Sequence, residues 1–152
     1  MVIYFGADHG GFPLKEHLKT FVKGLGYETA DMGNERLDPA DDYPDFAAAV
    51  AAKISGAEPG QARGILICRN GAGVTIAANK FPGVRAALAL NPDHAFDIRN
   101  DDDANVLGLA ADFVTPEEAE RLVRIFLEAP FEPAERRVRR LNKIKEMEKH
   151  YG

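Results

Sequence analysis

The only cysteine of the chain, Cys68, lies between a short apolar run and a glycine-rich turn. Residues 65–67 are typical of a strand buried on both faces, and Gly71 and Gly73 permit a tight turn into the helix that follows. A side chain at the carboxyl end of a parallel strand, facing the free N–H groups of a helix start, lies where such sheets bind ligands. The helix start and Arg69 both favour the thiolate form, so Cys68 can act as a base or a nucleophile. The alternative is a small buried apolar residue.

A carboxylate and an imidazole follow another apolar run. Residues 2–7 are typical of a buried strand and lead directly into Asp8-His9-Gly10-Gly11. Because the carboxyl ends of parallel strands open at one edge of a sheet, we expect Asp8, His9 and Cys68 to converge there. His9 has an alternative role, which is to cap its own turn.

The elements that must position these residues alternate between strands and helices. Apolar runs predict strands over residues 2–7, 27–32, 64–68, 84–90 and 105–109. Helical spacing predicts helices over residues 13–24, 43–54, 74–80, 116–128 and 135–149, with a short one starting at Asn91-Pro92. Thr115-Pro116-Glu117-Glu118 is a capping box at the start of one of them. This order predicts an α/β fold, a doubly wound five-stranded parallel sheet with right-handed crossovers and an additional C-terminal helix.

Composition narrows the class of protein. The length of 152 residues suits one domain, residues 1–152, and a single cysteine rules out an internal disulfide. The sequence starts in a strand pattern and has no apolar run of about 18 residues, so we expect a cytoplasmic protein with no membrane partner. The net charge of −5 argues against a nucleic-acid partner. Residues 136–149 are nonetheless basic, which suits either a local anionic target or a solvated helix.

Five segments together resemble the ribose-5-phosphate isomerase B family, which includes the galactose-6-phosphate isomerase subunits. They are Asp8-His9-Gly10-Gly11, Asp42-Tyr43-Pro44, residues 64–80 with Ile76-Ala77-Ala78-Asn79-Lys80, Gly83-Val84-Arg85-Ala86, and Asp103-Ala104-Asn105-Val106-Leu107. The resemblance implies a Rossmann-like domain that forms a homodimer or homotetramer with shared active sites and needs no metal or organic cofactor. It implies an aldose–ketose isomerase, with ribose 5-phosphate and ribulose 5-phosphate as the default pair. The alternatives are another sugar phosphate, a tetrose 4-phosphate or hexose 6-phosphate, or a non-catalytic sugar-phosphate-binding subunit.

The resemblance also implies roles for individual residues. Cys68 would move a proton between C1 and C2 of the open-chain sugar, and Asp8 would handle hydroxyl protons. Asn70 and the backbone amides through Gly71, Ala72 and Gly73 would hold the enediolate oxygen.

Further residues are implied to contact the substrate or its phosphate. They are His9, Tyr43, Arg69, Asn105, Arg136 and Arg140. Arg136 and Arg140 are four positions apart, so they share a helix face and suit a phosphate, and in the family they commonly reach the partner's site. Tyr43 is equally well interpreted as a core contact, and Asp42 as a helix cap.

Two positions depart from the family pattern. Asp101 stands where the family usually has the histidine assigned to opening the furanose ring, so the resemblance places it among the catalytic residues. A carboxylate can accept a hydroxyl proton but is a poor proton donor at neutral pH. Asp112 stands where some relatives place a phosphate-binding arginine. Arg69, where glycine is common, either replaces that charge or points outward. No set of His, Cys and Asp residues has metal-ligand spacing, so no metal is expected.

Overall fold

The computed structural model describes residues 1–151 as a parallel five-stranded sheet with helices on both faces. The strands are β1 (Val2–Ala7), β2 (Glu28–Asp31), β3 (Ala62–Cys68), β4 (Ala86–Leu88) and β5 (Val106–Ala110), in the order β2-β1-β3-β5-β4. The helices are α1 (Phe12–Gly24), α2 (Tyr43–Ser55), α3 (Ala72–Ala78), α4 (Pro92–Asn100), α5 (Pro116–Glu128) and α6 (Glu135–Tyr151). All pairings are parallel, so the predicted α/β fold with an additional C-terminal helix is confirmed.

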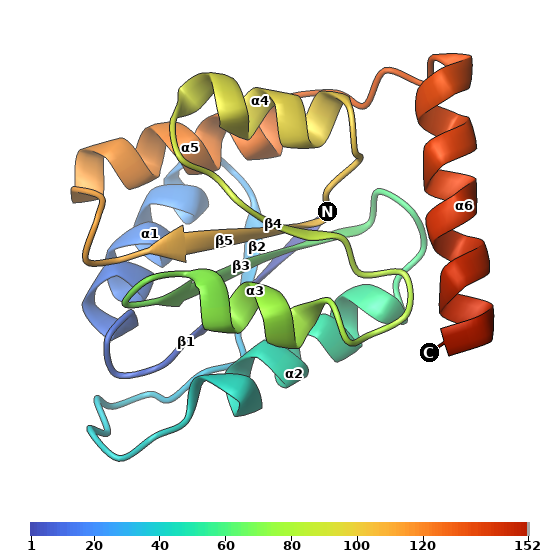
Figure 1. The fold of residues 1–152 in the computed structure, drawn as a ribbon. Coiled ribbons are helices and arrows are strands. Elements are labelled where there is room, and N and C mark those ends of the chain that lie inside the picture. Colours follow the sequence, from blue (N-terminus) through green and yellow to red (C-terminus); the bar gives the residue numbers. More distant parts are fainter. Residues whose placement is uncertain (152) are drawn as a thin grey trace.

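The helices form two layers around the sheet. Figure 1 shows α1, α4 and α5 on one face and α2 and α3 on the other. Side chains of β3 alternate between the two layers: Ile65 and Ile67 join the core under α1 and α5, and Leu66 joins the core under α2 and α3. All three are fully buried. The uninterrupted apolar run before Cys68 therefore reflects burial on both faces, as predicted.

Most predicted boundaries lie within two residues of the observed ones, and the largest change in length is that of β4. The predicted strand covered residues 84–90, whereas β4 comprises only three residues. The backbone before and at its start also bonds to amide side chains, although the Arg85 carbonyl still accepts from the Val106 N–H of β5 at 3.3 Å. Asn105 accepts a hydrogen bond from the Arg85 N–H at 2.8 Å, and Asn79 bonds both the N–H and the C=O of Ala86 at 2.8 Å. At α5 the predicted capping box is confirmed, with Glu118 N–H donating to Thr115 Oγ1 at 3.2 Å.

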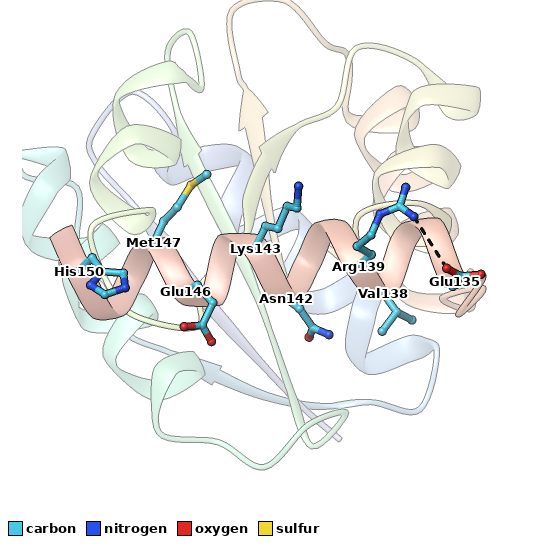
Figure 2. Close-up of a pocket in the computed structure, with 8 residues that line it drawn as sticks. All are labelled: Glu135, Val138, Arg139, Asn142, Lys143, Glu146, Met147 and His150. Carbon is cyan, nitrogen blue, oxygen red and sulfur yellow. Dashed lines mark ion pairs between the residues drawn. The ribbon is translucent and has the colours of Figure 1, made fainter.

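Helix α6 lies across the end of the sheet from which β5 starts, opposite the β5 arrowhead (Figure 1). Glu148 accepts a hydrogen bond from the Gly83 N–H at 2.9 Å, and Arg137 near the start of α6 pairs with Asp101 at the end of α4. The apolar side chains of Val138, Ile144 and Met147 stay exposed. Figure 2 looks onto the outward face of α6, where Val138 and Met147 line a shallow depression of about 760 Å³.

Candidate active site

Two neighbouring strands deliver the candidate catalytic residues to one edge of the sheet. β1 and β3 pair directly, and Ala7 at the end of β1 is in register with Ile67, one residue before the end of β3. Asp8 follows Ala7, and Cys68 follows Ile67. Both side chains are buried, at 7% and 4% exposure. The structure therefore brings the acid, the imidazole and the thiol to the same carboxyl edge, as the sequence predicted.

The turn after β3 directs a backbone donor at the thiol. Gly71 has φ +71°, a left-handed conformation that glycine adopts without strain. In this conformation its N–H donates to Cys68 Sγ at 3.2 Å. The side-chain oxygen of Asn70 accepts from the Ala72 N–H at 3.0 Å and lies 3.8 Å from the sulfur. Sulfur, amide side chain and turn amides are thus gathered in one place, and the Gly71 and Ala72 N–H groups bond the sulfur and the Asn70 oxygen there.

Asp8, and not His9, caps the turn after β1. Asp8 Oδ1 accepts a hydrogen bond from the Gly11 N–H at 3.0 Å, and the Asp8 carbonyl accepts from the same N–H at 3.0 Å. The alternative in which His9 caps its own turn is therefore wrong. The bond fixes the Asp8 carboxyl group beside the end of β3.

His9 is held by the loop between β2 and α2. Its backbone N–H and its Nδ1 both lie within bonding distance of Asp41 Oδ1, at 2.9 Å and 2.8 Å. Asp41 Oδ2 accepts from Asn34 Nδ2 at 3.1 Å. The sequence analysis did not single out Asp41 or Asn34. The sequence shows only that residues 35–42 are rich in acidic side chains. It does not indicate which of them bonds His9, because the His9–Asp41 contact joins residues 32 positions apart.

The base of this loop is anchored by a buried ammonium group. Lys15 on α1 has no exposed surface, and its Nζ donates to Asp31 Oδ1 at 3.0 Å and to the Asn34 carbonyl at 2.8 Å. Burial alone would raise the pKa of Asp31, but the hydrogen bonds from Lys15 and Lys19 outweigh it and hold that pKa below its usual value. The start of the loop is thus bound to α1 by charge-assisted hydrogen bonds.

Two more candidate residues lie beside the same turns. The Tyr43 ring packs directly on Gly73, where a Cβ would lie 2.7 Å from the ring, and the residue is 40% exposed. Tyr43 therefore contacts the start of α3 rather than the core. The aliphatic stem of Arg69 packs on Gly10, and its guanidinium lies 3.7 Å from Asp112 Oδ2. Arg69 and Asp112, which both differ from the residues common in the family, therefore pair with each other.

The remaining candidate residues lie at the opposite edge. Asn105 directly precedes β5, whose far end, Ala110, is in register with Cys68. A strand of five residues spans roughly 16 Å. Both ends of the Asn105 amide bond to backbone, since Oδ1 accepts from Arg85 N–H and Nδ2 donates to the Gly83 carbonyl, each at 2.8 Å. In this chain Asn105 thus braces the loop before β4.

Asp101, Arg136 and Arg140 belong to this second edge as well. Asp101 follows α4 and forms an ion pair with Arg137. Arg136 and Arg140 are exposed on α6. The structure does not bring these residues to Cys68 of the same chain.

Neither a metal centre nor a membrane span is found in the described part of the chain. Within residues 1–151, no group of three or more His, Cys, Asp or Glu side chains could hold a metal ion. None of the helices over the same residues is long and apolar enough to cross a membrane.

Comparison with known proteins gives consistent matches over nearly the whole chain. The Ribose/Galactose Isomerase family matches residues 3–144. A probable ribose-5-phosphate isomerase B of Mycoplasma pneumoniae is 43% identical over 93% of this chain and 91% of its own, and ribose-5-phosphate isomerase B of Mycobacterium tuberculosis is 38% identical over 98% and 91%. The structure of ribose-5-phosphate isomerase B from Mycoplasma genitalium with bound ribulose 5-phosphate superposes with a TM-score of 0.93, at 42% identity, covering 97% of this chain and 96% of that one.

Proposed function

Because this chain belongs to the ribose/galactose isomerase family, we propose that it is an aldose–ketose isomerase that interconverts ribose 5-phosphate and ribulose 5-phosphate. One observation carries the proposal: Cys68 lies at the carboxyl end of β3 with the Gly71 N–H directed at its sulfur. The relative with bound ribulose 5-phosphate has the same fold over nearly its whole length.

Cys68 is the base in the proposed reaction. As thiolate it removes the proton from C2 of the open-chain aldose, giving an enediolate, and returns a proton to C1 to give the ketose. The negative charge that develops on oxygen is stabilised by Asn70 and the N–H groups of Gly71, Ala72 and Gly73. Asp8 takes the proton from the C2 hydroxyl and supplies one to O1, so that atoms and charge balance over the cycle.

The phosphate is assigned to basic side chains from two edges of the sheet. His9 and Arg69 flank Gly10 at the edge that carries Cys68. Arg136 and Arg140 lie at the other edge, and we assign them to the site of a second copy. Asp101 and Asn105 belong to the same edge and would approach that second site with them.

A homodimer or homotetramer with shared active sites follows from that assignment. It is supported by the separation of the two clusters within one chain and by the exposed apolar residues Val138, Ile144 and Met147 on α6. Light scattering coupled to gel filtration tests the oligomer, since it should give a mass of at least twice the chain's 16.6 kDa. A mass of one chain at micromolar concentration would contradict it.

We place the enzyme in the cytoplasm, in sugar-phosphate metabolism of the pentose phosphate type, with no cofactor.

A tetrose 4-phosphate is the second candidate substrate, and one observation favours it. Asp101 is held in an ion pair with Arg137, which leaves no proton donor at the position of the family's ring-opening histidine. A pentose 5-phosphate closes to a furanose through O4, whereas in a tetrose 4-phosphate that oxygen carries the phosphate and the sugar stays open.

The deciding experiment is an isomerisation assay with ribose 5-phosphate, erythrose 4-phosphate and a hexose 6-phosphate. We expect the highest kcat/KM with ribose 5-phosphate. A higher kcat/KM with the tetrose would assign that substrate instead. Tight binding of ribose 5-phosphate with no exchange of the C2 hydrogen would identify a non-catalytic binding subunit and refute the proposed activity.

A further inference from the structure

We propose that Asp41, oriented by Asn34, is a positioning residue that holds His9 with its proton on Nδ1 and presents Nε2 to the phosphate of the substrate. The inference rests on the proposed function and deepens it by naming what orients the phosphate-binding imidazole. It derives from a chain of hydrogen bonds that runs from buried Lys15 through the loop after β2 to His9.

The first step is the geometry at His9. Asp41 Oδ1 lies 2.8 Å from His9 Nδ1 and also accepts the His9 backbone N–H at 2.9 Å. A carboxylate only accepts hydrogen bonds, so Nδ1 must carry a proton to bond it. Nε2 is then the nitrogen left for a ligand, and the His9 side chain is 31% exposed. A second proton on Nε2 would give a cation that donates to phosphate oxygen.

The second step is what orients Asp41. Its side chain is 7% exposed, and its other oxygen accepts from Asn34 Nδ2 at 3.1 Å. Three donors therefore converge on the two oxygens of one nearly buried carboxylate. The Asn34 backbone is fixed in turn, because its carbonyl accepts from Lys15 Nζ at 2.8 Å.

The third step is the place to which His9 is held. His9 is followed by Gly10, against which the Arg69 stem packs, so two side chains able to bind an anion meet at one corner beside Cys68. Neither Asp41 nor Asn34 has to touch the substrate to matter there. Their effect on the reaction passes through the direction and tautomer of the His9 ring.

The test is Asp41→Asn, which removes the negative charge and turns one oxygen into a donor facing the Asn34 donor. We expect KM for ribose 5-phosphate and the inhibition constant of inorganic phosphate to rise together by about tenfold, since hydrogen bonds to charged groups are worth roughly that much. kcat should change less than twofold, because the lost contact serves substrate and transition state alike. The matched control is Asp38→Asn in the same loop. The Asp38 carboxylate accepts from the Ala40 N–H, and its backbone carbonyl, which the substitution retains, accepts from the Asp41 N–H, so this variant should leave all three constants unchanged.

Two further readouts separate positioning from simple structural damage. The ¹⁵N shifts of His9 should report a proton on Nδ1 in the natural protein and a mixture of tautomers in Asp41→Asn. The double variant Asn34→Asp with Asp41→Asn reverses donor and acceptor, so it should restore part of the lost phosphate affinity. The shift measurement needs no turnover, and it therefore stands even if the natural protein fails to isomerise ribose 5-phosphate.

Three results would overturn the role of Asp41. They are an unchanged KM and phosphate inhibition constant in Asp41→Asn, a fall in kcat with KM unchanged, and ¹⁵N shifts that show a proton on Nε2 and none on Nδ1 in the natural protein. Failure of the double variant to recover any phosphate affinity would remove Asn34 from the assignment and overturn it in the stated form.

Discussion

The turn after β1 packs tightly against the end of β3. The variant Gly11→Ala tests whether this contact determines the position of the catalytic residues. A Cβ on Gly11 would lie 2.5 Å from the Ile67 carbonyl oxygen and 2.7 Å from its carbonyl carbon. Contacts of a real Cβ below 3.0 Å are essentially never seen, so backbone must move by several tenths of an ångström. Since the atoms in the way belong to the main chain of β3, no side-chain rotation can relieve the clash.

The size of the effect follows from that geometry. Overpacking of this kind costs about 1–3 kcal/mol of unfolding free energy. The Gly11 N–H bonds Asp8, so displacing the turn also displaces the Asp8 carboxylate from Cys68. A displacement approaching 1 Å can cost about 10²-fold in rate. We therefore expect kcat/KM to fall by about one to two orders of magnitude, and the unfolding free energy to fall with it.

The assay is urea unfolding combined with isomerase kinetics on Gly11→Ala and on a control, Gly24→Ala. Apart from the neighbouring residues and backbone of α1 itself, no heavy atom lies within 4 Å of a Cβ on Gly24, so that variant should gain about 0.4–1 kcal/mol and keep its activity. Natural stability in Gly11→Ala would refute the close contact. Lost stability with unchanged kcat/KM would refute the coupling between this turn and catalysis.

Two other substitutions test charges around the site. Asp101→His breaks the ion pair with Arg137, which should lower the unfolding free energy by at most about 1 kcal/mol. The same variant should raise kcat/KM for ribose 5-phosphate relative to erythrose 4-phosphate by up to about 10²-fold, because general acids contribute about 10²–10⁴-fold. Equal ratios before and after would mean that Asp101 does not limit ring opening. The pKa of Asp31 is lowered by Lys15 and Lys19, so its stabilising effect is complete above pH about 4 and is lost as the pH falls through the folded-state pKa. Unfolding free energies at pH 6 and pH 3 should differ less in Asp31→Asn than in the natural protein, and an identical difference would contradict the assignment.

Elements defined by local sequence could be predicted closely. β1 has the predicted bounds because residues 2–7 are apolar, and α5 starts where Thr115 and Glu118 satisfy each other's backbone N–H groups. β4 was predicted too long. The side chains of Asn79 and Asn105 bond the backbone at and before its start, from seven and 20 positions away along the chain. An apolar strand pattern cannot reveal side chains that bond the backbone beside a short edge strand.

The same distinction between local and distant contacts applies to the site. The sequence predicts that one edge of the sheet carries Asp8, His9 and Cys68, because the carboxyl ends of neighbouring parallel strands lie at the same edge. Asp41 could not be predicted there, because its bond to His9 depends on the path of a polar loop with no periodic pattern. The location of Arg136 across the sheet from Cys68 likewise depends on how α6 leaves α5, which the break between residues 130 and 133 does not specify.

The central claim is that Cys68 transfers the proton between C1 and C2, and the most direct measurement is turnover by Cys68→Ala. Cys68 is buried and its sulfur accepts the Gly71 N–H, a single bond that the variant loses, so the variant should keep its circular dichroism spectrum and still bind ribose 5-phosphate. Loss of a base and proton donor should lower kcat by at least about 10²–10⁴-fold, with exchange of the substrate's C2 hydrogen lost in parallel. A folded Cys68→Ala that isomerises ribose 5-phosphate at the natural rate would contradict the account.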